Sequence, residues 1–182
     1  MATTDVLRRR TRKSSSSLSD LGLLILRVGV AATALHAGIL KAVDFTSTAQ
    51  FMADGGWQSP TFAAYLVTAT EIAGGAALLL GLLTPLAACG IVAAMIDAWA
   101  ATVSGAAVWS DPFSVPFLMA FAAATLLFVG AGAHSVDARV FGRPSWPGAV
   151  TVPSFLVAVA AAVATWVLLN GVNPLHLSTP GS

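Results

Sequence analysis

The chain has 182 residues, of which 57% are hydrophobic, only 9% are charged and one is a cysteine. Soluble domains carry roughly 25% charged residues, so this composition excludes an ordinary soluble protein and indicates a polytopic membrane protein. Cys89 alone makes no CxxC pair, no internal disulfide and no metal cage of thiolates, and a net charge of +1 gives no reason to expect a nucleic-acid partner.

Five apolar stretches are long enough, at about 17 to 25 residues each, to cross the hydrocarbon core as helices. They lie near residues 20–43, 60–83, 86–104, 115–132 and 150–169. These runs lack the alternation of barrel strands, so we predict an all-α, polytopic membrane helical bundle with a four-helix core and a fifth, C-terminal transmembrane helix. The expected organisation is a disordered basic arm, the four-span bundle, a linker with the fifth span, and a tail, over residues 1–17, 18–142, 143–170 and 171–182.

Basic residues set the expected orientation. The run RRRTRK, residues 8–13, precedes the first span, and Arg139 and Arg143 lie between the fourth and the fifth. The positive-inside rule then predicts a cytoplasmic amino terminus and an extracytoplasmic carboxyl tail, in an inner (plasma) membrane. In a four-span alternative the last stretch would lie on the membrane surface, which would move only the tail. The basic arm itself is interpreted as a topogenic or lipid-headgroup cluster.

The first span contains three ionisable residues, Arg27, His36 and Lys41. A charge in hydrocarbon costs several kcal/mol, so each is expected to be paired or to belong to a site. At 100° per residue, Arg27 and Lys41 share one stripe of small residues, whereas His36 points about 180° away from Arg27. We expect Lys41 to snorkel to the outer interface or to pair with Asp44. His36 is interpreted as an interfacial or subunit-contacting residue, and no haem or metal site is expected.

The loop after the first span predicts a short interfacial helix that seals the bundle end or, alternatively, gates a substrate. Thr46 or Ser47 would cap it, and the glycine pair at 55–56 would end it. Phe51 and Met52 would form its apolar side. A second short helix is predicted after the fourth span, with Ser135 as its cap.

The second and third spans each carry one acid, Glu71 and Asp97, on a face of small residues that favours packing inside the bundle. By helical rise both lie about 14 to 16 Å from the inner end, and Arg27 lies about 12 Å from it. We therefore predict one buried layer in which Arg27 forms a bidentate pair with Glu71 or Asp97. Two interpretations remain open: an ion-pair network that sets helix register, or a polar pocket that binds a quinone-like molecule or relays a proton.

Several runs of the sequence resemble the DoxX family of small bacterial membrane proteins. They are LRVGVAATALHAGILKAVDF, the GGW of the following loop, EIAGGAALLLGLLTPLAA, and the SVDA segment after the fourth span. The resemblance covers about residues 20–142, and its family positions are Arg27, His36, Lys41 and Glu71. It implies a membrane component of oxidoreductase systems, either a subunit of a quinone-linked enzyme or an anchor for redox-defence enzymes.

The function favoured at this point is a non-catalytic accessory subunit that packs against a larger membrane oxidoreductase, such as an actinobacterial respiratory complex or supercomplex, through spans four and five. Those two spans carry no ionisable residue, so they are interpreted as scaffold and as a partner-facing surface. The alternative is a quinone-reactive or proton-handling subunit that uses Arg27, Glu71 and Asp97. Besides the lipid bilayer and these partner subunits, a quinone or a lipid is the expected ligand.

Overall fold

The computed structural model describes residues 2–105 and 107–177, with side chains from Ser17 onward. Within these residues the chain forms seven helices and no strand. The helices are α1 (Ala2–Val43), α2 (Phe45–Asp54), α3 (Pro60–Leu80), α4 (Thr84–Ser104), α5 (Val115–Val129), α6 (Val136–Val140) and α7 (Gly148–Leu169). The prediction of an all-α membrane bundle is confirmed.

Four helical segments are long and apolar enough to cross a membrane, namely Ser17–Val43, Pro60–Leu80, Thr84–Ser104 and Gly148–Leu169. The fourth predicted span is shorter than expected, because α5 has 15 residues, about 22 Å of helix. Gly130 ends it with φ +93°, a conformation that favours glycine. The stretch that falls short of a full span is thus the fourth, and not the last as the four-span alternative supposed.

Helix α1 is longer than predicted. The sequence suggests a disordered arm before residue 18, whereas the helix continues back to Ala2. No glycine or proline interrupts residues 2–21, so no local signal stops the helix there. The side chains of residues 1–16 lie outside the described part of the chain.

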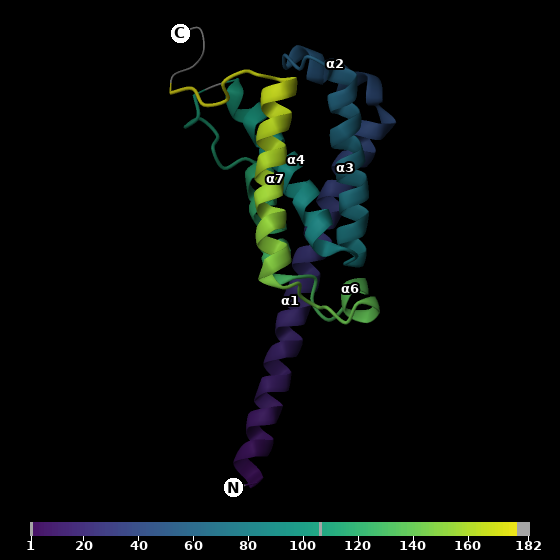
Figure 1. Cartoon of the computed structure of the whole chain (residues 1–182), viewed down its shortest axis with the longest axis vertical. Helices are drawn as coiled ribbons and strands as arrows, with labels where there is room; N and C mark the ends of the chain where they lie inside the picture. The colour runs from purple at the N-terminus through teal and green to yellow at the C-terminus, as the bar shows by residue number, and fades with distance from the viewer. Residues whose placement is uncertain (1, 106, 178–182) are drawn as a thin grey trace.

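The helices stand side by side, and the short helices α2 and α6 lie at opposite ends of the bundle (Figure 1). We call these the α2 end and the α6 end. Helices α1, α3, α4 and α5 pack around a common core, and α7 packs against α4 and α5. The start of α1 extends beyond the α6 end, and the last described segment, residues 171–177, lies at the α2 end (Figure 1).

At the α2 end, the cap of α2 differs from the prediction. Asp44 is the only residue between α1 and α2, and its carboxylate accepts a hydrogen bond from the Ser47 amide at 3.2 Å. This bond lowers the pKa of Asp44. Gly55 ends α2 as predicted. The chain therefore turns at Asp44, two residues before Thr46 and three before Ser47, and lays α2 across the bundle.

At the α6 end, the buried Asp137 ties three segments together. Its carboxylate accepts hydrogen bonds from the amides of Leu83 and Thr84, at 2.7 and 2.9 Å, and from the Trp146 indole at 2.9 Å. Burial by itself would raise the pKa of Asp137, but these hydrogen bonds outweigh it and hold the pKa below its ordinary value. Ser135 caps α6 as predicted, accepting from the Ala138 amide at 3.1 Å.

Helix α7 is held more firmly than a peripheral helix would be. The Leu169 carbonyl accepts from the Gln58 amide at 2.7 Å, and the Asn170 amide group donates to the Gly55 carbonyl at 2.9 Å. Trp166 also meets Trp57 edge to face, with ring centroids 5.6 Å apart. These contacts join the fifth span to the loop between α2 and α3, and its partner-facing role stays a prediction.

Candidate functional site

A cavity of about 480 Å³ lies in the α2 half of the bundle. Its long walls come from α3 and α4, which touch closely near the α6 end, where Gly74 faces the Ile91 side chain. Toward the α2 end, α4 leans away from α3 and passes behind α7 (Figure 1). The lining is mostly apolar: Phe51, Met52, Trp57, Ala63, Leu66, Val67, Gly90, Ala93, Ala94, Ala98, Ala101, Pro116 and Ala161, with Lys41, Thr70, Glu71, Asp97, Thr102 and Thr165 as the polar members.

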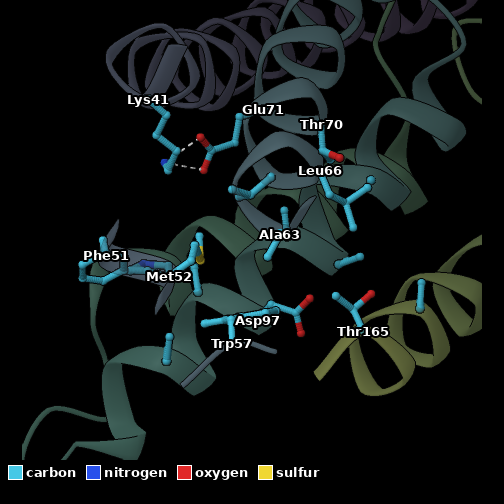
Figure 2. Close-up of a pocket in the computed structure, with 18 of the residues that line it drawn as sticks. Lys41, Phe51, Met52, Trp57, Ala63, Leu66, Thr70, Glu71, Asp97 and Thr165 are labelled. Atoms are coloured by element: carbon cyan, nitrogen blue, oxygen red, sulfur yellow. Dashed lines mark hydrogen bonds and ion pairs between the residues drawn. The ribbon is translucent and has the colours of Figure 1, made fainter. Parts of the chain in front are cut away.

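Lys41 and Glu71 form an ion pair in the cavity wall. The Lys41 Nζ lies 2.9 Å from Glu71 Oε1 and 2.7 Å from Oε2 (Figure 2). The Glu71 side chain is 2% exposed and that of Lys41 is 28% exposed. The pair exists because α1 and α3 approach at Gly38, where an added Cβ would lie 3.0 Å from the Glu71 Cβ.

This pairing corrects the prediction for Lys41, which expected snorkelling or a pair with Asp44. Asp44 instead caps α2 through the Ser47 amide. The close approach of α1 and α3 brings Lys41 over Glu71, so the lysine is held inside the bundle by a charge on the neighbouring helix. Helical spacing within α1 could not show this contact.

Asp97 contributes the second carboxylate of the cavity, from α4. It makes no hydrogen bond or ion pair with the described part of the chain, and its Oδ1 is buried without a partner. Figure 2 shows Asp97 apart from the Lys41–Glu71 pair, with Thr165 of α7 on the same side of the cavity. A carboxyl group left unsatisfied in an apolar wall has hydrogen-bonding capacity to offer a ligand.

Arg27 lies elsewhere, and the predicted pair with Glu71 or Asp97 is wrong. Its guanidinium donates to two backbone carbonyls, of Ala131 at 2.7 Å and of His134 at 2.6 Å. It also sits against Gly81 at the end of α3, ten residues from Glu71, which is about 15 Å along a helix. The prediction measured the depth of each residue from the inner end of its own helix and assumed that these ends lie at one level. In the structure α1 is displaced along α3, so Arg27 and Glu71 lie at different depths.

Arg27 therefore fastens the segment after α5 to α1. Asp137 lies near enough to attract its charge. With Asp137 bound to the start of α4, these two residues hold together the α6 end. Their arrangement supports a structural role for Arg27, separate from the cavity.

His36 is exposed on α1, whereas Arg27 on the same helix is 2% exposed. The prediction that the two residues face different directions is confirmed. His36 does not line the cavity. Its expected contact with another subunit stays a prediction.

The cavity also contains residues that the sequence did not assign to a site. Trp57, Thr70 and Thr165 line it, while Phe51 and Met52 were expected only to form the apolar side of a lid. Met52 is buried and Phe51 is 68% exposed. Thr70 could have been found from the sequence, because it is a polar residue directly before the buried acid Glu71. Nothing in the sequence of α7 marks Thr165 as a cavity residue.

Comparison with known proteins places this site within a family. Residues 22–105 match the family model named DoxX. No curated protein and no solved structure matches the chain. The matched range is shorter than the resemblance over about 20–142, since it ends just after α4 and leaves out α5, α6 and α7. It does include the ion pair and Asp97. Residues 22–105, a little under half of the chain, are therefore similar to the DoxX family.

Proposed function

We propose that this protein is a membrane subunit that binds a quinone-like, lipid-soluble redox molecule in the cavity and works beside a larger membrane oxidoreductase. The observation that carries the proposal is an apolar cavity whose wall holds one ion pair and one unpaired carboxyl group. Apolar walls with a few placed polar groups are typical of small-molecule sites, and 480 Å³ falls in their usual range of about 300 to 1,000 Å³.

The residues present suit such a molecule. Its ring would contact apolar side chains such as Trp57 and Val67. The Lys41 ammonium is a hydrogen-bond donor for a carbonyl oxygen, and the Asp97 carboxylate is an acceptor for a hydroxyl group. A bound quinone would supply the redox chemistry, with electrons from the partner oxidoreductase. The role of Asp97 would be to hold or release a proton at its carboxyl oxygens.

Binding can be tested with the purified full-length protein in lipid nanodiscs, titrated with a menaquinone analogue while tryptophan fluorescence is recorded. We expect saturable quenching that depends on Trp57 and that Trp57→Phe largely removes. Asp97→Asn should weaken binding by about tenfold, because it replaces a carboxyl group, which can exchange a proton with the ligand hydroxyl, by an amide that cannot. Asp111→Asn, in the exposed loop after α4, is the matched control and should bind as the unchanged protein does.

Two results would contradict the proposal. One is the absence of saturable binding to the folded protein. The other is equal affinity of the Asp97→Asn variant and the Asp111→Asn control. Intact fold in every variant is checked by its thermal unfolding temperature, so that lost binding is not mistaken for lost structure.

A second function, that of an assembly subunit, is favoured by helix α5. At about 22 Å it is shorter than a hydrocarbon core of about 30 Å. A short span is relieved by thinning the bilayer or by protein contact. Phe113 and Phe121 are 70% and 63% exposed, and the rings of both contact Phe117, forming an aromatic row that runs from the loop before α5 onto this helix.

Native purification in mild detergent tests this second function. We expect a larger oxidoreductase to copurify in stoichiometric amount, and Phe113→Ala with Phe121→Ala to reduce its yield. Phe62→Ala, on the exposed side of α3, is the matched control. A lone protein without partners would argue against the assembly role and leave the binding proposal standing.

A further inference from the structure

The cavity is covered at the α2 end. Helix α2 lies across the bundle there, with Met52 buried beneath it. The α2–α3 loop and the end of α7 are joined by the Gln58–Leu169 and Asn170–Gly55 hydrogen bonds and by the contact of two tryptophans. A ligand arriving along the bundle axis from that end would have to break these contacts.

Between α3 and α7 the wall is different. Helix α3 packs against α1, α2 and α4, and α7 packs against α4 and α5, but α3 and α7 form no packed interface within the described residues. Figure 1 shows the two helices standing apart, with α4 behind them. Leu66 of α3 and Ala161 of α7 both line the cavity and are both exposed. They therefore mark a side opening.

This opening lies within the length of the spanning helices. Leu66 is six residues from the start of α3 at Pro60, about 9 Å along the helix. Ala161 is eight residues before the end of α7 at Leu169, about 12 Å along it. Both helices are candidate membrane spans. The opening therefore faces the region that lipid chains occupy.

We propose that the gap between Leu66 and Ala161 is a lateral portal through which the ligand enters from the bilayer. The inference rests on the proposed binding function and names the ligand class more closely: an amphiphile with a compact polar head and a single hydrocarbon tail. The head reaches Asp97 and the Lys41–Glu71 pair. The tail leaves between α3 and α7 and stays in lipid.

Energetics favour this arrangement over a route that carries the tail through water. Each methylene of the tail that remains in hydrocarbon avoids the cost of contact with water. The two portal residues, Leu66 and Ala161, are apolar, so the tail leaves the cavity between apolar side chains. The polar head alone then determines which ligands the cavity binds, and ligands with tails of different lengths can be bound.

Bulky substitutions in the portal test the inference in nanodiscs of the full-length protein. Two probes are used: a naphthoquinone with an isoprenoid tail, and menadione, which has the same ring without the tail. Ala161→Trp should weaken binding of the tailed probe by about tenfold and that of menadione by less than about twofold. Leu66→Trp narrows the same gap from α3 and should weaken binding of the two probes in the same way. Agreement between the two variants would show that the loss does not come from a folding defect in one of them.

Val163→Trp provides the matched control, since Val163 lies two residues away on α7, is 55% exposed and does not line the cavity. It should bind both probes normally. Undiminished binding of the tailed probe to Ala161→Trp and Leu66→Trp would overturn the portal alone, as would an equal loss of both probes. If the unchanged protein binds neither probe, the binding function itself fails and the portal with it.

Discussion

Two buried carboxylates of this bundle are stabilised in different ways. Glu71 is 2% exposed and is neutralised by the Lys41 ammonium. Asp137 is fully buried and accepts three hydrogen bonds from neutral N–H groups. Asp97 has neither kind of partner among the described residues. Glu71 and Asp137 are therefore already paired within the protein, whereas Asp97 has hydrogen-bonding capacity left for a ligand.

Removing one partner of the ion pair should destabilise the protein more than removing the other. Lys41→Met leaves Glu71 buried without a counter-charge and should cost about 3 kcal/mol of unfolding free energy. Glu71→Gln should cost about 1 kcal/mol, because the Lys41 side chain is 28% exposed and its ammonium can turn toward water. Unfolding in mixed micelles measures both values. The explanation would be wrong if the two single variants lost equal unfolding free energy. It would also be wrong if the double variant were no more stable than Lys41→Met.

The lowered pKa of Asp137 predicts that the stability of the protein depends on pH. Its pKa is lowered in the folded protein, so its stabilisation is complete above the ordinary value near 4 and is lost as pH falls through the folded pKa. At pH 7, Asp137→Asn should cost about 1 to 3 kcal/mol, because one oxygen no longer accepts from N–H groups.

Thermal unfolding between pH 7 and pH 3 checks this expectation. The difference between the unchanged protein and Asp137→Asn should shrink at the acidic end. Asp111→Asn serves as the exposed control. A gap between the two proteins that does not change with pH would show that the carboxylate charge is unimportant at the α6 end.

At the scale of elements, glycines decide how α1 meets α3. An added Cβ at Gly75 would lie 3.0 Å from the Leu35 amide nitrogen and 3.2 Å from the Ala31 carbonyl oxygen, both backbone atoms. At Gly38 it would lie 3.0 Å from the Ile72 amide nitrogen. Small residues permit such close approach of membrane helices. The same approach places Lys41 over Glu71.

Alanine substitutions separate this packing role from helix propensity. Gly75→Ala should destabilise the protein by about 1 to 3 kcal/mol, because the helices must move apart. Gly29→Ala, on the same bundle but with no atom within 4 Å of the added Cβ, should be neutral or stabilising by up to about 1 kcal/mol. Unfolding free energies and the Lys41–Glu71 contact, probed by a double-variant cycle, are the measurements. Equal effects would refute the packing account.

For the whole molecule, helices α1, α3, α4, α5 and α7 run between the two ends. The described part of the chain begins beyond the α6 end, and its last segment, residues 171–177, lies at the α2 end (Figure 1). The tail is fixed at the α2 end, where the Val108 amide donates to the His176 carbonyl at 2.8 Å. Helix α5 therefore passes from one end to the other in spite of its 15 residues. This arrangement supports an odd number of crossings.

Reporter fusions test that topology and the predicted orientation together. A periplasm-active reporter, such as alkaline phosphatase, should be active at the carboxyl terminus and inactive at the amino terminus, and a cytoplasm-active fluorescent protein should show the reverse. The reason is the excess of Arg and Lys before α1 and after α5. Activity of one reporter at both termini would indicate an even number of crossings.

The sequence by itself determined the membrane class, the positions of the helices, the start of α3 at Pro60, the end of α2 at Gly55 and the cap of α6 at Ser135. These depend on hydrophobic length and on glycine, proline and capping residues, which act within one or two turns. It also placed Glu71 and Asp97 on faces that pack inside the bundle, but it expected Lys41 at the outer interface. Its choice of partner for Arg27 was wrong.

Only the tertiary structure decided which charges meet. Pairing depends on how far one helix is displaced along the next, and here close contacts at Gly38 and Gly75 set that displacement. The lean of α4 away from α3 then opens a cavity, and α7 brings Thr165 to its wall. No pattern within a single helix records these distances, because they arise from side-chain packing between segments far apart in the chain.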